Sequence, residues 1–221
     1  MFTDRRHGGR HLAEKLLPFA DAEPIVYALP RGGLPVADEA AKRLNAPLDL
    51  ILVRKIGAPG HQELAIGAVV DGAAPTTILH DDIIAELDVP DAYVKSAEAS
   101  ALKEIERRRK LYMKDRPPLS PKGRTAIIAD DGLATGATME AAVAAMRKAG
   151  AARIIVAVPV APRETLEKLQ RAADEVIAIE TPFPFCSVGS WYHSFPQLTD
   201  EDVIETMAHA AGGNPHAKRT P

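Results

Sequence analysis

Short apolar runs rich in β-branched residues alternate along the chain with longer segments in which apolar residues recur every three or four positions. Runs of the first kind predict strands, and segments of the second kind predict helices with one buried face. The strand-forming runs lie at 24–29, 48–53, 125–129, 153–158 and 175–179. This alternation is typical of α/β proteins, so we expect a parallel sheet of about five strands flanked by helices. We expect one such domain over residues 1–212 and a frayed tail at 213–221.

Two regions depart from this alternation. Between residues 56 and 80, glycines and prolines interrupt short strand-like pieces, which predicts a mobile lid outside the sheet rather than a layer of the core. A long helix is expected at about 91–114, ahead of Pro117 and Pro118. Its run of Lys, Arg and Glu at 103–110 indicates a solvated helix face rather than a nucleic-acid patch.

The composition narrows the class of protein. The 221 residues include 27 basic and 30 acidic ones, a net charge of −3, which offers no general attraction for nucleic acid or an anionic membrane. No apolar run is long enough for a membrane span, and the start lacks the apolar core of a signal peptide. The single cysteine, Cys186, excludes an internal disulfide and fits a reducing compartment. We therefore expect a cytoplasmic protein without nucleic-acid or membrane partners.

The segment from Ile127 to Thr138 is the strongest candidate for chemistry. An apolar strand leads into two adjacent acids, Asp130 and Asp131, and then into a Gly/Thr-rich turn that opens a helix. Open α/β sheets bind ligands at the carboxyl ends of their strands, and a turn at a helix N-terminus suits a phosphate. The two acids are then placed to accept hydrogen bonds from the hydroxyls of a ribose. For the acid doublet alone, an Asp-Gly turn with a helix cap is the plainer alternative.

Three segments of the chain resemble those of a known family. AIIADDGLATGATM resembles the phosphoribosyl-pyrophosphate (PRPP) motif of the type I phosphoribosyltransferases. YALPRGGLPVA is similar to the pyrophosphate loop of that family, and LVRKIGAPGHQELAIGAV resembles the start of its flexible lid. The residues of these segments and their order along the chain are most similar to those of phosphoribosyltransferases whose substrate is unassigned. The resemblance covers most of the chain and implies the type I fold, with a lid and a small hood.

The resemblance also implies a reaction and a set of residues. A nitrogenous, purine- or pyrimidine-like acceptor would displace pyrophosphate from C1 of PRPP, with Mg²⁺ held through PRPP and Asp130 and Asp131 nearby. Three groups of residues are implied, for catalysis, for the 5′-phosphate and for pyrophosphate: Asp130, Asp131 and Glu63; Ala134, Thr135, Gly136, Ala137 and Thr138; and Arg31, Gly32, Gly33, Arg54 and Lys55. Arg54 and Lys55 are expected to end the second strand. The Pro30–Arg31 peptide bond is expected to be cis, as the corresponding bond often is in the family.

Aromatic residues make up only 5% of the chain but gather at 181–198, where the family has its hood over the acceptor. With the N-terminal segment, this stretch is expected to form the hood, and Phe185, Trp191 or Tyr192 could stack on a planar base. The same residues could equally cover the sheet edge or form the contact of a homodimer. The alternative function is a non-catalytic protein that binds PRPP or a nucleotide and regulates a partner. The retained PRGG and RK segments and a full-length lid favour the enzyme.

Overall fold

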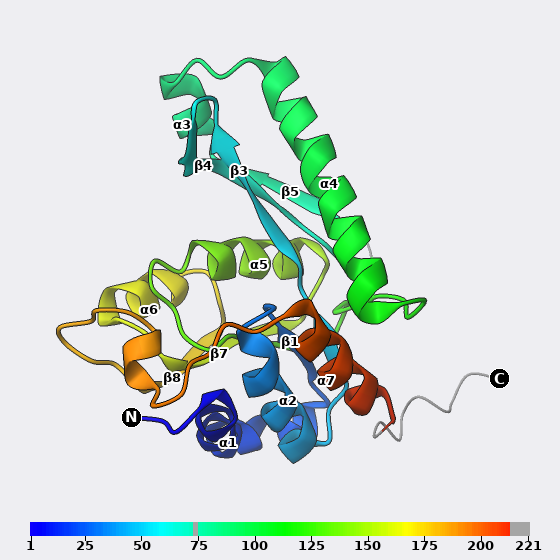
Figure 1. Cartoon of the computed structure of the whole chain (residues 1–221), viewed down its shortest axis with the longest axis vertical. Coiled ribbons are helices and arrows are strands. Elements are labelled where there is room, and N and C mark those ends of the chain that lie inside the picture. Colours follow the sequence, from blue (N-terminus) through cyan, green and yellow to red (C-terminus); the bar gives the residue numbers. More distant parts are fainter. Residues whose placement is uncertain (73–74, 213–221) are drawn as a thin grey trace.

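The computed structural model describes residues 1–72 and 75–212, except for the side chains of residues 62, 63, 211 and 212. The tail expected to fray, 213–221, lies outside the described residues. A sheet with helices on both faces forms the body of the molecule, and an arm of strands and helices projects from it (Figure 1). No helix in the described part is both long enough and apolar enough to cross a membrane.

The core sheet has five parallel strands, as expected from the sequence. In spatial order they are β2 (Leu48–Leu50), β1 (Ile25–Ala28), β6 (Thr125–Ala129), β7 (Arg153–Val160) and β8 (Glu175–Glu180). Ala28 at the end of β1 pairs with Ala129 at the end of β6. The turn after β1 and the loop after β6 therefore leave the sheet side by side.

Helices cover both faces of this sheet, which explains its continuous apolar strands. One face carries α1 (Arg5–Leu16), α2 (Gly33–Leu44) and α7 (Asp200–Gly212), and the other carries α5 (Ala137–Lys148) and α6 (Arg163–Leu169) (Figure 1). Neighbouring strand residues face opposite ways: Val26 and Ile127 pack toward α1 and α2, whereas Tyr27 and Ile128 pack toward α5. Two 3₁₀ turns complete the body: η1 (Leu17–Ala22) and η2 (Gly189–Trp191).

The arm corrects the expectation of short, irregular pieces at 56–80. It consists of an antiparallel sheet and two helices: β3 (Val53–Ala58), β4 (His61–Val70), β5 (Thr76–Leu79), α3 (Asp81–Glu86) and α4 (Asp91–Met113). Gly67 does not break β4, since it pairs with both neighbouring strands. A Cβ there would lie 2.5 Å from the carbonyl oxygen of Ile78 on β5. Close strand contact, rather than a turn, requires this glycine. The arm does leave the core sheet, as expected, whereas its mobility stays a prediction.

A buried charge cluster fastens the arm to the core. Arg109 on α4 donates to Asp49 on β2 (Nη2 to Oδ1, 2.8 Å) and to Asp71 just after β4 (Nη1 to Oδ2, 2.9 Å). Burial raises the pKa of Asp71 to about 6, although the Arg109 charge works against the rise. The expected solvated face is real for Arg107 and Arg108, which pair with Glu104, but Arg109 turns inward. Because Arg109 lies one helical turn beyond buried Ile105, helical periodicity places it on the buried face of α4.

Candidate active site

Two adjacent carboxylates stand at the carboxyl end of β6. Asp130 and Asp131 follow Ala129 directly, and the Asp131 backbone N–H donates to Asp130 Oδ1 (2.8 Å). Burial, together with the neighbouring charge of Asp131, raises the pKa of Asp130 well above its ordinary value. Burial also raises the pKa of Asp131, against the effect of Arg5, whose Nε donates to Asp131 Oδ2 (2.6 Å). Adjacent acids in such a site are paired, hydrogen-bonded or protonated, and a ligand that supplies hydroxyl donors or positive charge would stabilise their ionised forms.

The turn after β1 lies directly against these acids. The Pro30–Arg31 peptide bond is cis, as expected. A Cβ on Gly32 would lie 2.2 Å from Asp131 Oδ2, and one on Gly33 would lie 2.7 Å from the carbonyl oxygen of Ala129. Only glycine leaves room for this approach, so the paired glycines of the sequence serve the contact between the two loops.

The loop from Asp131 into α5 presents a helix N-terminus. Gly136 has φ of 79°, a conformation that glycine adopts readily, and the first backbone bond of α5 runs from Glu140 N–H to the Gly136 carbonyl (2.9 Å). The first-turn N–H groups before it point out of the helix, where an anion is favoured. The hydroxyl of Thr165 on α6 donates to the Ala134 carbonyl (2.6 Å) and fixes the loop from behind. Ala134 and Thr135 are exposed.

A pocket of about 620 Å³ joins the turn, the acids and α5. Its wall consists of Arg5, Leu29, Pro30, Arg31, Gly32, Asp130, Asp131, Thr138, Val188, Phe195, Pro196, Gln197 and Leu198. Both cations in this wall already face carboxylates: Arg5 pairs with Asp131, and Arg31 with Asp200 at the start of α7 (3.4 Å). A polyanionic ligand would therefore need a further cation. The carboxylate oxygens of Asp130 and Asp131, together with phosphate oxygens, fit the preference of Mg²⁺ for hard oxygen donors.

The N-terminal segment lies against the aromatic stretch 181–198, which we call the hood. Phe2 exchanges backbone hydrogen bonds with the hood, donating to Trp191 (2.8 Å) and accepting from His193 (2.9 Å). Tyr192 is buried, stacks on Phe195 with ring centroids 5.0 Å apart, and donates its hydroxyl to the Asp131 carbonyl (2.5 Å). The N-terminal segment and the hood thus rest on the acid pair.

Some residues expected at the site lie elsewhere. Phe185, Trp191 and Tyr192 pack in the hood cluster and do not line the pocket, whereas Phe195 does. Because Tyr192 is buried between Phe2 and Phe195, its ring is not offered to an acceptor.

Arg54 and Lys55, expected at the pyrophosphate, also lie outside the pocket wall. Arg54 and Lys55 are exposed on β3 and do not end the second strand, because β2 stops at Leu50 and the chain turns into the arm. Glu63 belongs to β4, but its side chain is outside the described part of the structure.

Arg5, like Phe195, is a site residue that the sequence analysis missed. Arg5 and Asp131 are 126 positions apart in the chain, so no local sequence pattern predicts their contact. The side chain is only 9% exposed although it lies on the first turn of α1.

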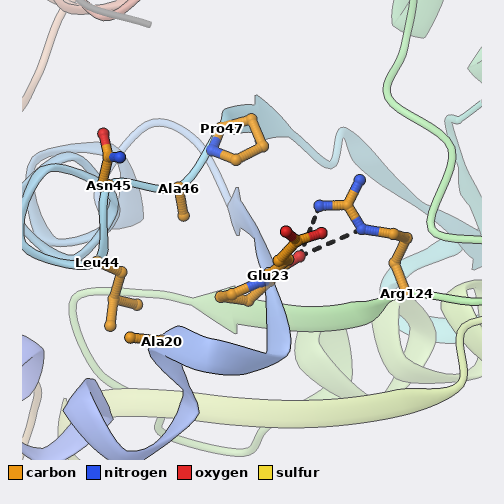
Figure 2. A pocket seen from close by; sticks show the side chains of 8 residues that line it. Ala20, Glu23, Leu44, Asn45, Ala46, Pro47 and Arg124 are labelled. Atoms are coloured by element: carbon orange, nitrogen blue, oxygen red, sulfur yellow. Dashed lines mark hydrogen bonds between the residues drawn. The ribbon is translucent and has the colours of Figure 1, made fainter. Parts of the chain in front are cut away.

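A second pocket, of about 360 Å³, lies at the opposite end of the strands. Pro24 precedes β1 there. Pro47 precedes β2 and Arg124 precedes β6 (Figure 2). Arg124 donates from Nε (3.2 Å) and Nη2 (2.5 Å) to the Glu23 carbonyl. This pocket contains none of the predicted site residues, and Arg124 is already occupied with the backbone.

Residues 5–190 match the family model of the phosphoribosyl transferase domain. Two proteins of Mycobacterium tuberculosis, from strains CDC 1551 / Oshkosh and ATCC 25618 / H37Rv, carry the provisional name phosphoribosyl transferase. Each is 39% identical over 210 residues, which cover 95% of this chain and 47% of the relative. The chain thus spans about half the length of these relatives. The crystal structure of TT1426 from Thermus thermophilus is 42% identical with a TM-score of 0.83, covering 95% of this chain and 98% of that one. Since the family match runs from α1 into the hood and includes the acid pair and both loops beside it, the chain belongs to the phosphoribosyl transferase domain family.

Proposed function

We propose that this protein transfers the 5-phosphoribosyl group of PRPP to a nitrogenous, purine- or pyrimidine-like acceptor and releases pyrophosphate. One observation carries the proposal. The acid pair, the Pro30–Gly33 turn and the first turn of α5 face one pocket, and the turn approaches the acids closely enough to require glycine. A 5-phosphoribosyl group needs that combination: hydroxyl acceptors between an anion-binding loop on one side and a pyrophosphate-binding turn on the other.

Each part of the pocket then has a role. The first turn of α5, with Thr138, holds the 5′-phosphate through backbone and hydroxyl donors. Arg31 and the glycine turn receive the pyrophosphate. Asp130 and Asp131 accept from the ribose hydroxyls and stabilise the positive charge that develops on the ring as the bond at C1 breaks. Asp130 and Asp131 would hold Mg²⁺ together with the phosphate oxygens of PRPP, and the bound ion would supply charge that neutralises the leaving pyrophosphate.

The arm is the proposed lid. Arg54 and Lys55 lie on its strand β3, outside the wall of the pocket, and Glu63 belongs to its strand β4. We propose that they reach PRPP or the acceptor only after the arm closes, which would also exclude water that hydrolyses PRPP. The acceptor would enter past Phe195 and Val188, and the protein is expected to act in the cytoplasm.

The test incubates the full chain with PRPP, Mg²⁺ and a panel of purine and pyrimidine bases, and it measures pyrophosphate and nucleotide. Asp130→Asn and Asp131→Asn should each lower kcat/KM by about 100-fold, since each removes a negative charge from beside the developing cation. Asp115→Asn is the matched control, because Asp115 is exposed and does not line the pocket. It should leave kcat/KM unchanged.

Two outcomes would contradict the proposal. PRPP binding without turnover on any base would favour the regulatory alternative, in which the pocket senses PRPP. Absence of PRPP binding, with the wild type as inert as both Asn variants, would exclude both functions.

A further inference from the structure

Arg5 connects three segments that are far apart in the chain. Its Nε donates to Asp131 Oδ2 (2.6 Å), its Nη1 donates to the carbonyl of Pro196 (2.8 Å), and its guanidinium carbon lies 3.6 Å from the centroid of the Phe195 ring. The side chain also forms part of the pocket wall. One planar group thus touches the acid pair and two consecutive residues of the hood.

Each contact uses a different property of the guanidinium. The bond to Asp131 is charge-assisted and fixes the direction of the carboxylate. The bond to Pro196 needs a second N–H at the angle that the planar fork provides, and the stacking on Phe195 needs a flat cation. A lysine could keep the first contact but not all three, because its ammonium is a single compact charge.

The carboxylate that Arg5 holds is the one that the adjacent turn leaves least room to move. Gly32 lies so close to Asp131 Oδ2 that a Cβ there would meet it at 2.2 Å. Tyr192, from the hood, holds the backbone of the same residue through the Asp131 carbonyl. Arg5 completes this clamp from the α1 side, so the orientation of Asp131 and the position of the hood depend on the same side chain.

We propose that Arg5 is a positioning residue of the transfer reaction: it orients Asp131 toward the ribosyl group and ties residues 195–196 of the hood to the acid pair. The orienting role rests on the proposed function, whereas the tie to the hood does not. Arg5 acts through Asp131 and the hood rather than on the reacting atoms.

The experiment compares Arg5→Met, Arg5→Lys and a neighbouring control, Arg6→Met. Arg6 pairs with Asp38 and Glu39 on α2 and does not line the pocket. For each protein the measurements are kcat and KM for PRPP in the pyrophosphate assay, the unfolding temperature, and amide hydrogen exchange of residues 187–198 without ligand.

Arg5→Met should lower kcat by about 100-fold, and Arg5→Lys should recover about tenfold of that loss, because it restores the charge beside Asp131. Hydrogen exchange of 187–198 should accelerate in both Arg5 variants, since neither keeps the planar contacts to Phe195 and Pro196. Arg6→Met should match the wild type in kcat and in exchange.

A wild-type kcat in Arg5→Met would overturn the orienting role. Equal losses of kcat in Arg5→Met and Arg5→Lys, together with a lower unfolding temperature in both, would also overturn it. Unchanged exchange of 187–198 in both Arg5 variants would overturn the tie to the hood. A wild type that does not turn over PRPP would refute the proposed function and, with it, the orienting role, while the exchange measurement still decides the tie to the hood.

Discussion

Replacing Gly32 by alanine would place one methyl group against the acid pair. Gly32 has φ of −59° and ψ of −40°, a conformation that any residue adopts, so the backbone itself does not require glycine. Elsewhere a Gly→Ala change at such a position stabilises a protein by about 0.4–1 kcal/mol, because it restricts the unfolded chain. At Gly32 a steric clash outweighs this gain, because the new Cβ would lie 2.2 Å from Asp131 Oδ2 and 2.7 Å from Asp131 Cγ.

The carboxylate must therefore move by more than about 1 Å to reach an ordinary van der Waals distance. It cannot do so freely, because Arg5 Nε holds the same oxygen at 2.6 Å. A misplacement of about 1 Å at a reacting centre lowers activity by about 100-fold. The strain of overpacking, about 1–3 kcal/mol, is partly offset by the gain in the unfolded state, so the expected loss of stability is small, about 1–2 kcal/mol.

The assay compares Gly32→Ala with Gly123→Ala. A Cβ on Gly123 would meet nothing within 4 Å, but its φ of 70° disfavours alanine. Gly123→Ala should lose about 1–2 kcal/mol of unfolding free energy with unchanged kcat/KM, whereas Gly32→Ala should lose about 100-fold in kcat/KM. Urea denaturation and the pyrophosphate assay measure the two quantities. A Gly32→Ala protein with the kcat/KM of the wild type would refute the claim that the glycine serves the position of Asp131.

Two further predictions concern the buried cluster at the base of the arm. Arg109→Met leaves the buried carboxylates of Asp49 and Asp71 without their cation and should lower the free energy of unfolding by about 3–5 kcal/mol. Arg108→Met removes only a partly exposed pair and should lower it by less than about 1 kcal/mol in the same urea titration. Equal effects of the two variants would contradict this assignment. The pKa of Asp71 is about 6 in the folded protein against 3.8 ordinarily, so the folded state takes up the proton first. The contribution of this group to stability therefore falls by about 3 kcal/mol as the pH rises from about 4 to about 6, and Asp71→Asn should flatten the measured pH dependence of unfolding over that window. An unchanged pH profile in Asp71→Asn would show that Asp71 ionises normally.

Much of the architecture follows from local patterns. The five apolar runs become the core strands: β1, β2, β6 and β7 are buried on both faces, which a continuous hydrophobic sequence indicates directly, and the edge strand β8 is half-buried. The helix expected at about 91–114 is α4, Asp91–Met113. Thr199 caps α7, its Oγ1 accepting from the Asp202 N–H (3.2 Å). Caps and periodicities extend over a few residues, so one segment contains all the information that they need.

The arm was harder to foresee, because its strands depend on partners. Gly57 and Gly67 read as breaks in a single sequence, yet each is paired within the antiparallel sheet of β3 and β4. The Arg109 cluster likewise brings together Asp49, Asp71 and Arg109, which lies 60 residues beyond Asp49 and 38 beyond Asp71. Strand propensity measures the fit to neighbouring strands more than a preference of the chain itself.

The sequence by itself determined that Asp130 and Asp131 stand at the end of a buried strand and open a phosphate-type loop, since strand, acids and turn are contiguous. It also placed two glycines where the turn after β1 needs them. Only the tertiary structure decided that Arg5 holds Asp131, that Tyr192 faces the acid pair from within the hood, and that Phe195 lines the pocket. These contacts join α1, β6 and the hood, and side-chain periodicity reports only which face of an element is buried. Which distant side chain covers that face is set by how the elements pack.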